Sequence, residues 1–533
     1  MKLTFAFLFI GIITSLSQTP DTLWTKTLGG SGDECPGYGF DYRARIAVND
    51  FGETYVVCAT VSTDGMVGMN KGSADCWIVK LDENGNTLWS KVYGGTNAEF
   101  PQDITVLEDG GCLVAGYTYS DDLDFSGNHG VDGESDGFIM RLDNDGNLMW
   151  NELYGGSEFM GVAGEDYIYD IILLKNGNVM ALGQTNSQNG DLVFEANFDY
   201  FYVGWVLEIE LYDGEIADTK KIAWTGHDEW NTDEIIEGVE ASDDSGYYFL
   251  GLSTHTFSGA DFFWLIKMSP DWEVVWQKEL GCLGQNSAYS MTETDSATIV
   301  FTGIIYSSDG DVTEPVIGGY GDIWIAEADS SGNIINQKII GGTQSETIYK
   351  VNNDGNGHLL LSGFTRSVDF YGQGDTTTVA DFWVLSMNMQ LDTLWTLKQG
   401  GTQSDILTDI AVNNGNIFVT GRSESSDLFL HQNYGLKDLW VAKFENPYVL
   451  AEQTQLIEEV NIYPNPSSGS FTLALPQGMN EITEISFYNS SGKLIKTQNC
   501  HEGQSIFHNL PKGYYILKIR NDKKVFFEKL VVL

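Results

Sequence analysis

The sequence contains few basic residues. Only 28 of its 533 residues are lysine or arginine, against 75 aspartate and glutamate, so the formal net charge is −47. Residues 460–533 carry +3 and Lys2 adds one more positive charge, which leaves −51 on the rest of the chain. A surface of this charge repels phosphate backbones and anionic membranes, which excludes nucleic acid as a ligand and favours cations or basic partners.

Long apolar runs are absent after residue 16. The one run, LTFAFLFIGIITSL at 3–16, follows Met1-Lys2 and is shorter than the roughly 20 residues that span a bilayer. Its length and the small residues after it are typical of a secretory signal peptide. We therefore predict a signal peptide over residues 1–17 and a soluble, exported mature chain that is not an integral membrane protein.

Motifs of metal binding and nucleophilic catalysis are also lacking. The six cysteines show no CxxC spacing, so we expect mostly buried small thiols, and the seven histidines form no HExxH. The sequence GESDG at 133–137 fits G-x-S-x-G, but it precedes a strand and not the helix that a nucleophile elbow needs. We predict no catalytic residue and no cofactor. Acidic turns such as 143–145 are compatible with a calcium site, although capping of a hairpin explains these residues better.

The main feature of the sequence is an internal repeat with a period near sixty residues. An aromatic-containing strand before a Gly-Gly pair is clear at 23–30, 88–95 and 149–156, and degenerate copies follow four times. A second marker is an aspartate followed by an aromatic-rich apolar strand, as at Asp75, Asp136, Asp322, Asp381 and Asp438. Two short strands lie between the markers, and helical periodicity is absent. Four-stranded units at fixed spacing predict a β-propeller.

Counting strands predicts how the ring closes. Each marker occurs seven times, the chain starts with an outer strand at 21–30, and the last unit ends at Phe444 without its fourth strand. We therefore predict an all-β fold in which residues 18–446 form a seven-bladed β-propeller that the N-terminal strand closes. The Asp-x-x-Gly-Asn link at 82–86, 143–147 and 329–333 predicts tight hairpins, because Gly and Asn tolerate positive φ.

The repeat resembles a known family. The elements W-x-K-x-x-GG-T, D-I, DG-G and G-N-x-x-W, in this order, are similar to the SBBP-type beta-propeller repeats of bacterial exported proteins. The resemblance covers roughly residues 21–446 and is weakest in repeats three to five. It implies a propeller fold and export, and it names no ligand.

Acidic residues recur in the loops that lead from each Gly-Gly pair to the next innermost strand. Such loops share one face of a propeller, so they predict an acidic ligand-binding face made by Glu34, Glu99, Glu165, Asp233, Glu346 and Asp405. The alternative is that these acids cap turns at strand starts, since recurrence in every repeat usually reflects the fold.

The C-terminal segment follows an acidic linker, residues 447–459, and is a different small all-β unit, a predicted β-sandwich over residues 460–533. Its blocks are Tyr463-Pro464-Asn465-Pro466 with Gly469, then Gly492-Lys493, then Gly513 and Tyr515, and finally Lys529. Together they resemble the type A sorting domain of the type IX secretion system of Bacteroidota. That resemblance implies recognition by the outer-membrane secretion machinery, passage through the periplasm, and a final location at the cell surface or outside the cell. An accessory β-sandwich with a binding role is the alternative.

The function that these features favour is that of an exported propeller that binds a protein or glycan without catalysis. A secreted glycan-degrading lyase or hydrolase on the same scaffold is the alternative. Clustered carboxylates with histidine or arginine in the channel would favour the enzyme, and the sequence shows no such spacing.

Overall fold

The computed structural model divides the chain into two compact units, residues 1–447 and 448–533. In the first unit it describes residues 19–36, 43–130, 133–157, 163–187, 189–191, 202–223, 232–243, 245–255, 259–317, 321–367, 379–427 and 433–447. In the second it describes 461–474, 483–489, 493–500, 505–507, 510–520 and 525–532. The predicted signal peptide and nearly all of the predicted linker lie outside these ranges.

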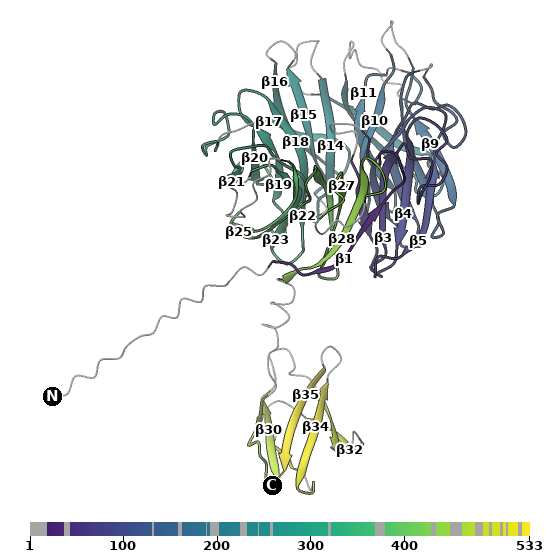
Figure 1. Ribbon diagram of the computed structural model, residues 1–533. Helices are drawn as coiled ribbons and strands as arrows, with labels where there is room; N and C mark the ends of the chain where they lie inside the picture. The colour runs from purple at the N-terminus through teal and green to yellow at the C-terminus, as the bar shows by residue number, and fades with distance from the viewer. Residues whose placement is uncertain are drawn as a thin grey trace, which may run out of the picture. The chain divides into compact units, whose positions relative to one another are not determined.

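The strands of the first unit form four-stranded antiparallel sheets, which we call blades (Figure 1). Blade 1 contains β2 (Arg45–Val48), β3 (Thr54–Thr60), β4 (Asp75–Leu81) and β5 (Thr87–Tyr93). Blade 2 contains β6 (Glu99–Val106), β7 (Cys112–Thr118), β8 (Asp136–Leu142) and β9 (Leu148–Tyr154). Blade 3 contains β10 (Asp166–Leu173), β11 (Val179–Thr185), β12 (Val203–Ile209) and β13 (Ile216–Ile222).

Four further blades follow. Blade 4 contains β14 (Thr232–Glu240), β15 (Tyr247–His255), β16 (Ala260–Met268) and β17 (Val274–Leu280). Blade 5 contains β18 (Asn286–Glu293), β19 (Ile299–Ile305), β20 (Asp322–Ala328) and β21 (Ile334–Ile340). Blade 6 contains β22 (Glu346–Asn353), β23 (His358–Thr365), β24 (Asp381–Asn388) and β25 (Thr393–Gln399). Blade 7 contains β26 (Asp405–Asn413), β27 (Asn416–Ser423), β28 (Asp438–Glu445) and β1 (Thr22–Leu28).

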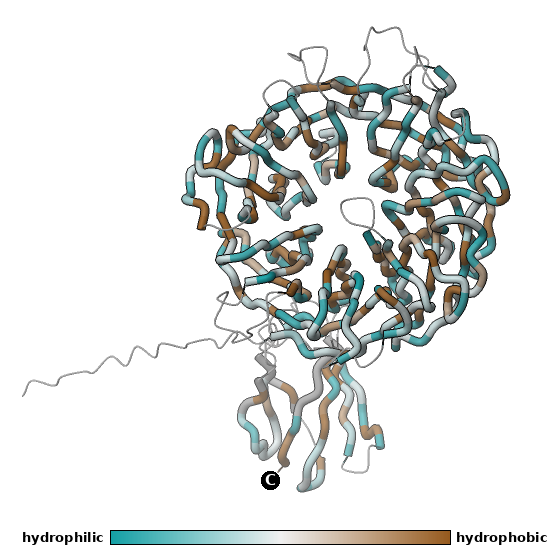
Figure 2. Tube along the Cα trace, turned by 45° about the horizontal axis from the view of Figure 1, so that its top comes forward, coloured by the Kyte–Doolittle hydropathy of each residue, from teal (hydrophilic) through white to brown (hydrophobic). Residues whose placement is uncertain are grey.

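The blades stand around one axis, with the first strand of each blade innermost (Figure 2). The prediction of an all-β propeller is therefore confirmed. In blade 7, β1 pairs antiparallel with β28, so that Leu28 lies opposite Leu439. Blade 7 also contacts blade 1, where Thr408 Oγ1 donates a hydrogen bond to Ala44 O at 2.8 Å. The two ends of the propeller sequence thus meet in one sheet.

Apolar side chains on both faces of each sheet pack between neighbouring blades. The third strand carries a tryptophan in six blades, and each of these side chains is at most 1% exposed: Trp77, Trp205, Trp264, Trp324, Trp383 and Trp440. Burying such a side chain contributes about 2–3 kcal/mol. The recurring tryptophans are therefore core residues and not a ligand surface.

The Asp-x-x-Gly-Asn links form the hairpins between third and fourth strands. Asp82 Oδ1 accepts hydrogen bonds from Asn84 N at 2.9 Å and Asn86 N at 2.7 Å, and Gly85 has φ +77°. The indole of Trp24, on the outer strand of blade 7, donates to Glu83 O at 3.0 Å. Trp89 and Trp276 donate in the same way to Asn144 O and Ser330 O in the hairpins of the next blades, which explains why both motifs recur together.

The cysteines agree with the sequence analysis wherever the structure describes them. Cys35, Cys58, Cys76, Cys112 and Cys282 are buried free thiols. Cys58 lies opposite Trp77, so it does not face Cys76 across the adjacent strands.

The second unit is also all-β. One sheet contains β29 (Asn461–Tyr463), β30 (Ser470–Ala474) and β33 (Ser505–Phe507). The other contains β32 (Leu494–Cys500), β31 (Thr483–Asn489), β34 (Gly513–Arg520) and β35 (Val525–Val532). Phe471, Phe487 and Leu517 are buried in one core shared by the two sheets.

Deleting residues 21–28 should destabilise the propeller, because β28 would lose its hydrogen-bonded partner and expose an unpaired edge. We expect the melting temperature to fall by about 10 °C, as measured by differential scanning calorimetry. Leu23→Ser is the matched control in the same strand, since Leu23 is 49% exposed. A deletion variant that melts with the parent protein would contradict closure by β1.

Candidate functional site

Five of the six acids predicted to form a ligand-binding face lie at or beside the start of an innermost strand, and Glu34 lies ahead of β2 in an isolated bridge with Thr60. Five of the six have side chains that are at most 2% exposed: Glu34, Glu99, Asp233, Glu346 and Asp405. Side chains enclosed to this degree cannot contact a ligand in solvent. The prediction of an acidic binding face is therefore wrong for these five residues.

Glu99 shows what these acids do. Its Oε2 accepts a hydrogen bond from Gly95 N at 2.9 Å, and its Oε1 accepts one from Thr118 Oγ1 at 2.8 Å. Gly95 follows the outer strand of blade 1, whereas Thr118 ends the second strand of blade 2. Corresponding contacts are made by Glu346 and Asp405. The acids thus cap a backbone N–H at each blade junction, where a buried unsatisfied donor would cost stability.

The close packing at the blade junction also explains why the motif has two glycines. A Cβ on Gly94 would lie 2.3 Å from the carboxyl group of Asp75. A Cβ on Gly95 would lie 2.3 Å from the Cβ atom of Ser120. No larger residue fits at either position, so the motif marks a blade junction and not a ligand loop.

Each cap lies near a second buried carboxyl, that of the aspartate that begins the third strand of the preceding blade. Asp75 and Glu99 form this pair between blades 1 and 2, and Asp438 and Glu34 form it between blades 7 and 1. Burial raises the pKa of Glu99 and of Glu34 to about 7. It raises the pKa of Asp75 and of Asp438 to about 6. The pairs therefore retain protons at a pH where solvated carboxyls have lost them.

Glu165 differs from the other five predicted acids. In blade 3 the cap is Asp166, whose Oδ2 accepts a hydrogen bond from Gly156 N at 2.9 Å. Glu165 precedes it and is only half-buried. Its Oε2 accepts a hydrogen bond from the hydroxyl of Tyr167 at 3.0 Å, and the hydroxyl of Tyr202 donates to the same oxygen. Among the six predicted residues, Glu165 is thus the one that solvent reaches.

Glu165 belongs to an aromatic group at the junction of blades 2 and 3, which we call the rim cluster. Its members are Phe100, Tyr117, Tyr119, Glu165, Tyr167, Tyr169 and Tyr202. Tyr117 and Tyr167, from different blades, meet edge to face with ring centroids 4.6 Å apart. The cluster lies where innermost strands start and a second strand ends, which is one face of the ring. All members except Tyr117 are partly exposed.

A second group, which the sequence analysis missed, lies near the ring axis. The innermost strands of blades 2 to 7 each have a β-bulge. The residues that follow the bulges, with Arg45 of blade 1, form what we call the axial cluster: Arg45, Asp103, Asp170, Glu237, Ser290, Lys350 and Asp409. The Asp-Ile dipeptide that recurs in three of these strands is the signal that could have found it.

Side chains of the axial cluster join each blade to the next. Asp103 Oδ2 accepts a hydrogen bond from Ile171 N of blade 3 at 3.1 Å. Asp409 Oδ2 accepts one from Ile46 N of blade 1 at 2.9 Å. The same type of contact is made by Asp170, Glu237 and Ser290. These polar groups serve the ring itself, because adjacent blades share no backbone ladder.

The side chains of two basic residues, Lys350 and Arg43, lie across the axis and contact residues of other blades. The ammonium group of Lys350 in blade 6 pairs with Glu237 in blade 4. Burial alone would lower the pKa of Lys350, but the pKa is raised by the carboxylates of Glu237, Asp409, Asp170 and Asp103, which lie on four blades. The guanidinium of Arg43 lies 4.7 Å from the ring centre of Tyr349 and 5.4 Å from that of Tyr289. The axis is thus occupied by charged groups of the protein.

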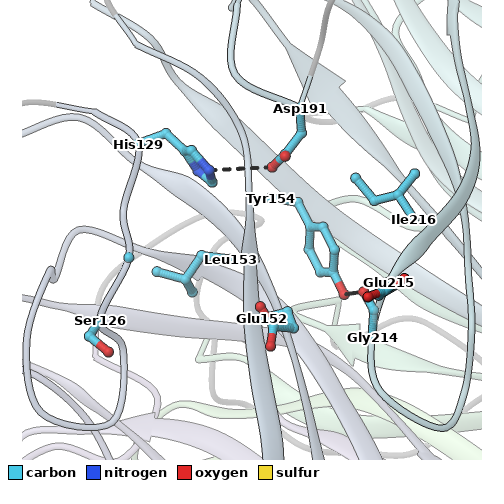
Figure 3. Close-up of a pocket in the computed structure, with 10 residues that line it drawn as sticks. Ser126, His129, Glu152, Leu153, Tyr154, Asp191, Gly214, Glu215 and Ile216 are labelled. Carbon is cyan, nitrogen blue, oxygen red and sulfur yellow. Dashed lines mark hydrogen bonds and ion pairs between the residues drawn. The ribbon is translucent and has the colours of Figure 1, made fainter.

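A pocket of about 410 Å³ lies between the outer strands of blades 2 and 3 (Figure 3). The acids Glu152, Asp191 and Glu215 line it, and Leu153 and Ile216 add apolar surface. Burial and then the neighbouring carboxylate of Asp191 raise the pKa of Glu152. A pocket of this composition repels anionic ligands.

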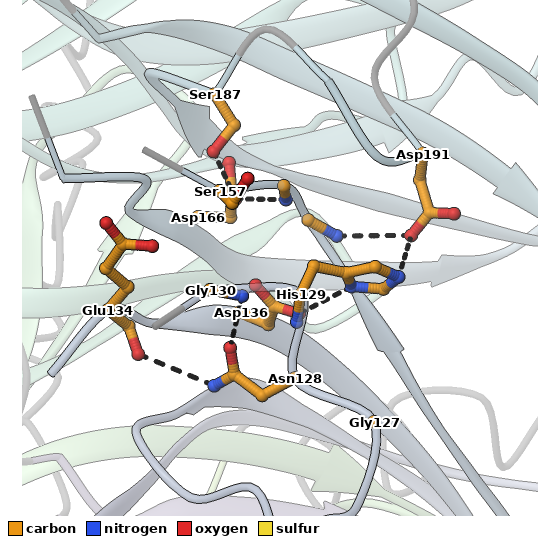
Figure 4. Close-up of polar contacts among 12 residues, drawn as sticks. Gly127, Asn128, His129, Gly130, Glu134, Asp136, Ser157, Asp166, Ser187 and Asp191 are labelled. Carbon is orange, nitrogen blue, oxygen red and sulfur yellow. Dashed lines mark hydrogen bonds and ion pairs between the residues drawn. The ribbon is translucent and has the colours of Figure 1, made fainter. Parts of the chain in front are cut away.

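His129 lies at the edge of this pocket between two carboxylates (Figure 4). Its Nδ1 is 2.7 Å from Asp136 Oδ2, and its Nε2 is 3.6 Å from Asp191 Oδ2. The hydrogen bond to Asp136 raises the pKa of His129. Blade 1 has Lys71 in the corresponding place, with its ammonium paired to Asp124 of blade 2. His129 is therefore an ion-pair partner between blades, as Lys71 is.

The other motifs considered for chemistry are structural. Ser135 of GESDG is fully buried and is followed by strand β8, so it cannot act as an exposed nucleophile. In the turn considered for calcium, Asp143 Oδ1 accepts hydrogen bonds from Asp145 N at 3.0 Å and Asn147 N at 2.7 Å. Within the described ranges, no three His, Cys, Asp or Glu side chains are grouped as they would be to hold a metal ion.

The sorting-motif residues predicted in the second unit come together from its two ends. Asn465 Oδ1 accepts a hydrogen bond from Val531 N at 2.9 Å, and its amide donates to Lys529 O at 2.6 Å. Tyr515, with a buried ring, donates to Pro511 O at 2.9 Å. The structure also describes Tyr463, Pro464, Pro466, Gly469, Lys493 and Gly513, whereas Gly492 lies outside the described residues.

Glu99→Gln should remove one of the buried titrations. The folded-state pKa of Glu99 is raised from 4.5 to about 7, so the stability that its protonation provides is lost as the pH rises through about 7. The loss is at most about 3 kcal/mol. The amide should be tolerated, because blade 5 has Asn286 at this position, with Cys282 N donating to its Oδ1 at 3.0 Å.

The measurement is urea unfolding of both proteins at about pH 5 and about pH 8. The wild-type protein should lose more stability between these values than Glu99→Gln does. Equal losses would contradict the role of Glu99 in this pH dependence.

His129→Lys should make the junction of blades 2 and 3 less sensitive to pH. The stability that protonated His129 provides is fully present below pH 6.5, its ordinary pKa, and is lost as the pH rises through its elevated folded-state value. A lysine side chain stays charged over this pH range. Melting curves should diverge above neutral pH in favour of the lysine variant, with His129→Ala less stable than both. A His129→Lys protein that weakens in parallel with the wild type would refute the ion-pair role.

Comparisons with known proteins bear on the two units differently. Residues 461–533 match the secretion system C-terminal sorting domain family. Over 145 residues, which are 26% of this chain and 15% of the relative, the sequence is 26% identical to the regulatory protein FlaEY of Caulobacter vibrioides. The chain thus spans less than a sixth of that curated relative's length.

Two solved structures are similar in fold. Puromycin hydrolase matches with 10% identity and a TM-score of 0.44, over 89% of this chain and 58% of that one. The β-propeller domain of the Trilobed protease from Pyrococcus furiosus matches with 8% identity and a TM-score of 0.38, over 76% of this chain and 97% of that one.

The destination of the protein follows from its second unit. No helix within the described ranges is long and apolar enough to cross a membrane. Residues 461–533 match the sorting domain family, and the structure joins the first and last motif blocks of that segment. Residues 461–533 are therefore a type IX secretion sorting domain, and the protein to which they belong is exported to the cell surface or released from the cell.

Proposed function

We propose that this protein is an exported binding module, whose propeller recognises a ligand at one face of the ring without catalysis. The observation that carries the proposal is the rim cluster, the partly exposed aromatic and acidic group at the junction of blades 2 and 3. The acids of the blade junctions and of the axis are hydrogen-bonded to backbone N–H groups, so they serve the fold.

The internal repeat supports this assignment of roles. The second strand of five blades ends in Thr-x-Ser or Ser-x-Ser, and the second of these residues donates its backbone N–H to the hydroxyl of the first. The middle residue differs among these five blades, as Val61, Tyr119, Asn186, Arg366 and Glu424, whereas blade 5 has a tyrosine, Tyr306, at this position. Positions that keep their residue in all blades hold the fold together, and positions that vary at the same site are free to contact a ligand.

A secreted glycan-degrading enzyme is the second candidate. One observation favours it, namely that Asp103, Asp170, Glu237 and Asp409 gather near Arg45 and Lys350 on the axis. Against it, each of these carboxylates accepts a backbone N–H from the following blade. Asp170→Asn with Asp409→Asn would abolish hydrolysis of a polysaccharide if the axis were catalytic, and would leave ligand binding at the rim intact if it were not.

A binding screen of the full mature chain against protein and neutral and acidic glycan arrays tests the main proposal. The screen should be run with and without calcium, because the acidic turns are compatible with calcium binding, on which recognition of a ligand would then depend. We expect saturable binding with no turnover of the ligand. Release of reducing ends or unsaturated products from the bound glycan would favour the enzyme.

Removing residues 461–533 should stop export at the periplasm, because the sorting domain carries the signal that the outer-membrane secretion machinery recognises. Immunoblots of periplasm, outer membrane and medium measure this outcome. A propeller point variant such as Glu99→Gln is the matched control and should be exported as the wild type is. Normal appearance of the truncated chain outside the cell would refute this role of the segment.

A further inference from the structure

The rim cluster includes one repeat position that is aromatic in blades 2 and 3 and not in blades 6 and 7. The residue after the junction cap is Phe100 in blade 2 and Tyr167 in blade 3, whereas blades 6 and 7 have Thr347 and Ile406 there. The core tryptophans of the third strands recur, so they belong to the fold. The fold therefore does not require a ring at the Phe100 and Tyr167 position, whereas Tyr169, the bulge residue of its strand, has counterparts in Tyr289 and Tyr349 of blades 5 and 6.

The rings of the rim cluster are in continuous contact across two blades, through the buried ring of Tyr117. Phe100 lies 5.2 Å from Tyr117, which lies 5.9 Å from Tyr119 and 4.6 Å from Tyr167, centroid to centroid. Tyr167 is parallel to Tyr169, with an interplanar angle of 3° and centroids 6.0 Å apart. Rings held this way by their neighbours lose little freedom when a flat ligand stacks on them.

Glu165 adds a hydrogen-bond acceptor at the edge of this surface. Tyr167 and Tyr202 both donate their hydroxyls to its Oε2. Its Oε1 has no hydrogen-bond partner among the described residues. A carboxylate that already binds two hydroxyl groups has the geometry to accept a third from a ligand.

We propose that the rim cluster is a binding site for a neutral glycan. This inference rests on the proposed function and names the ligand class of its site. The apolar C–H face of a sugar ring stacks on the exposed aromatic surface, and a sugar hydroxyl donates to Glu165. Uronic, sialylated or sulfated glycans are disfavoured, because the rim stands on a propeller whose segment of the chain carries a formal charge of −51.

A basic peptide is the competing ligand, and the structure favours it less. Acidic residues are spread over the whole propeller, so charge alone would draw a cation to many places. The feature specific to the rim is its aromatic surface, and its one carboxylate accepts hydrogen bonds from hydroxyl groups. Both features match a sugar better than an ammonium group.

The test uses the full mature chain and soluble neutral polysaccharides, namely glucans, xylans, mannans and galactans. Affinity electrophoresis selects the polysaccharide, and calorimetry on its oligosaccharides gives the affinity. Two substitutions come from the same site in other blades, which keeps them compatible with the fold: Tyr119→Asn, as Asn186 in blade 3, and Tyr167→Thr, as Thr347 in blade 6. Each should weaken binding at least tenfold with an unchanged melting temperature.

Glu165→Gln, which cannot accept with both oxygens, should weaken binding less than the loss of a ring does. Tyr212→Ser is the matched control, since Tyr212 is 83% exposed on a hairpin away from the rim, and it should bind as the wild type does. Binding should be insensitive to salt, because no ion pair forms.

Three results would overturn the inference, and they differ from failure of the proposed function. Glycan binding that survives Tyr119→Asn and Tyr167→Thr would keep the binding module and place its site elsewhere. Salt-sensitive binding of basic peptides, with no neutral glycan bound, would keep the module and replace the ligand class. Absence of any ligand in the protein and glycan screens would remove the proposed function itself.

Discussion

The propeller depends on one buried hydrogen bond, in which an acid at the start of an innermost strand accepts from the backbone N–H that follows the preceding blade. Blades are separate sheets, so no backbone ladder crosses from one to the next, and the end of each outer strand would leave a buried donor unsatisfied. An unsatisfied buried N–H costs about 1–3 kcal/mol. Glu99 supplies the acceptor between blades 1 and 2, and Asn286 does so in blade 5.

This contact explains several features that otherwise look unrelated. The glycine before the capped residue leaves room for the second carboxyl, and the hydroxyl of Thr118 satisfies the other oxygen of the cap. The Gly-Gly pair, the acid that follows it and the threonine that ends the second strand are therefore one structural unit. The unit recurs because the same backbone donor, that of Gly95, Gly156, Gly342 or Gly401, follows the outer strand at each of four described junctions.

Burial of the caps also changes the electrostatics of the molecule. A formal charge of −47 counts every carboxyl as ionised. In the folded protein, burial raises the pKa of Glu34, Glu99 and Asp166 to about 7, so these groups are partly protonated near neutral pH. The folded propeller is thus less negative than its composition implies. Part of its acid content stabilises junctions, and only the exposed part acts on ligands.

Sequence alone determined the architecture and the destination of this protein. Repeat markers, turn chemistry and an incomplete last unit were enough for the propeller and for the pairing of β1 with β28, because each is a local pattern that recurs along the chain. The motif blocks from Tyr463 to Lys529 were enough for the sorting domain.

Tertiary structure decided which acids are buried, since the same Gly-Gly-acid pattern fits an open loop or a sealed junction. It also decided that Lys350 meets Glu237, and that Tyr117 meets Tyr167, because residues on different blades come together only when the ring closes.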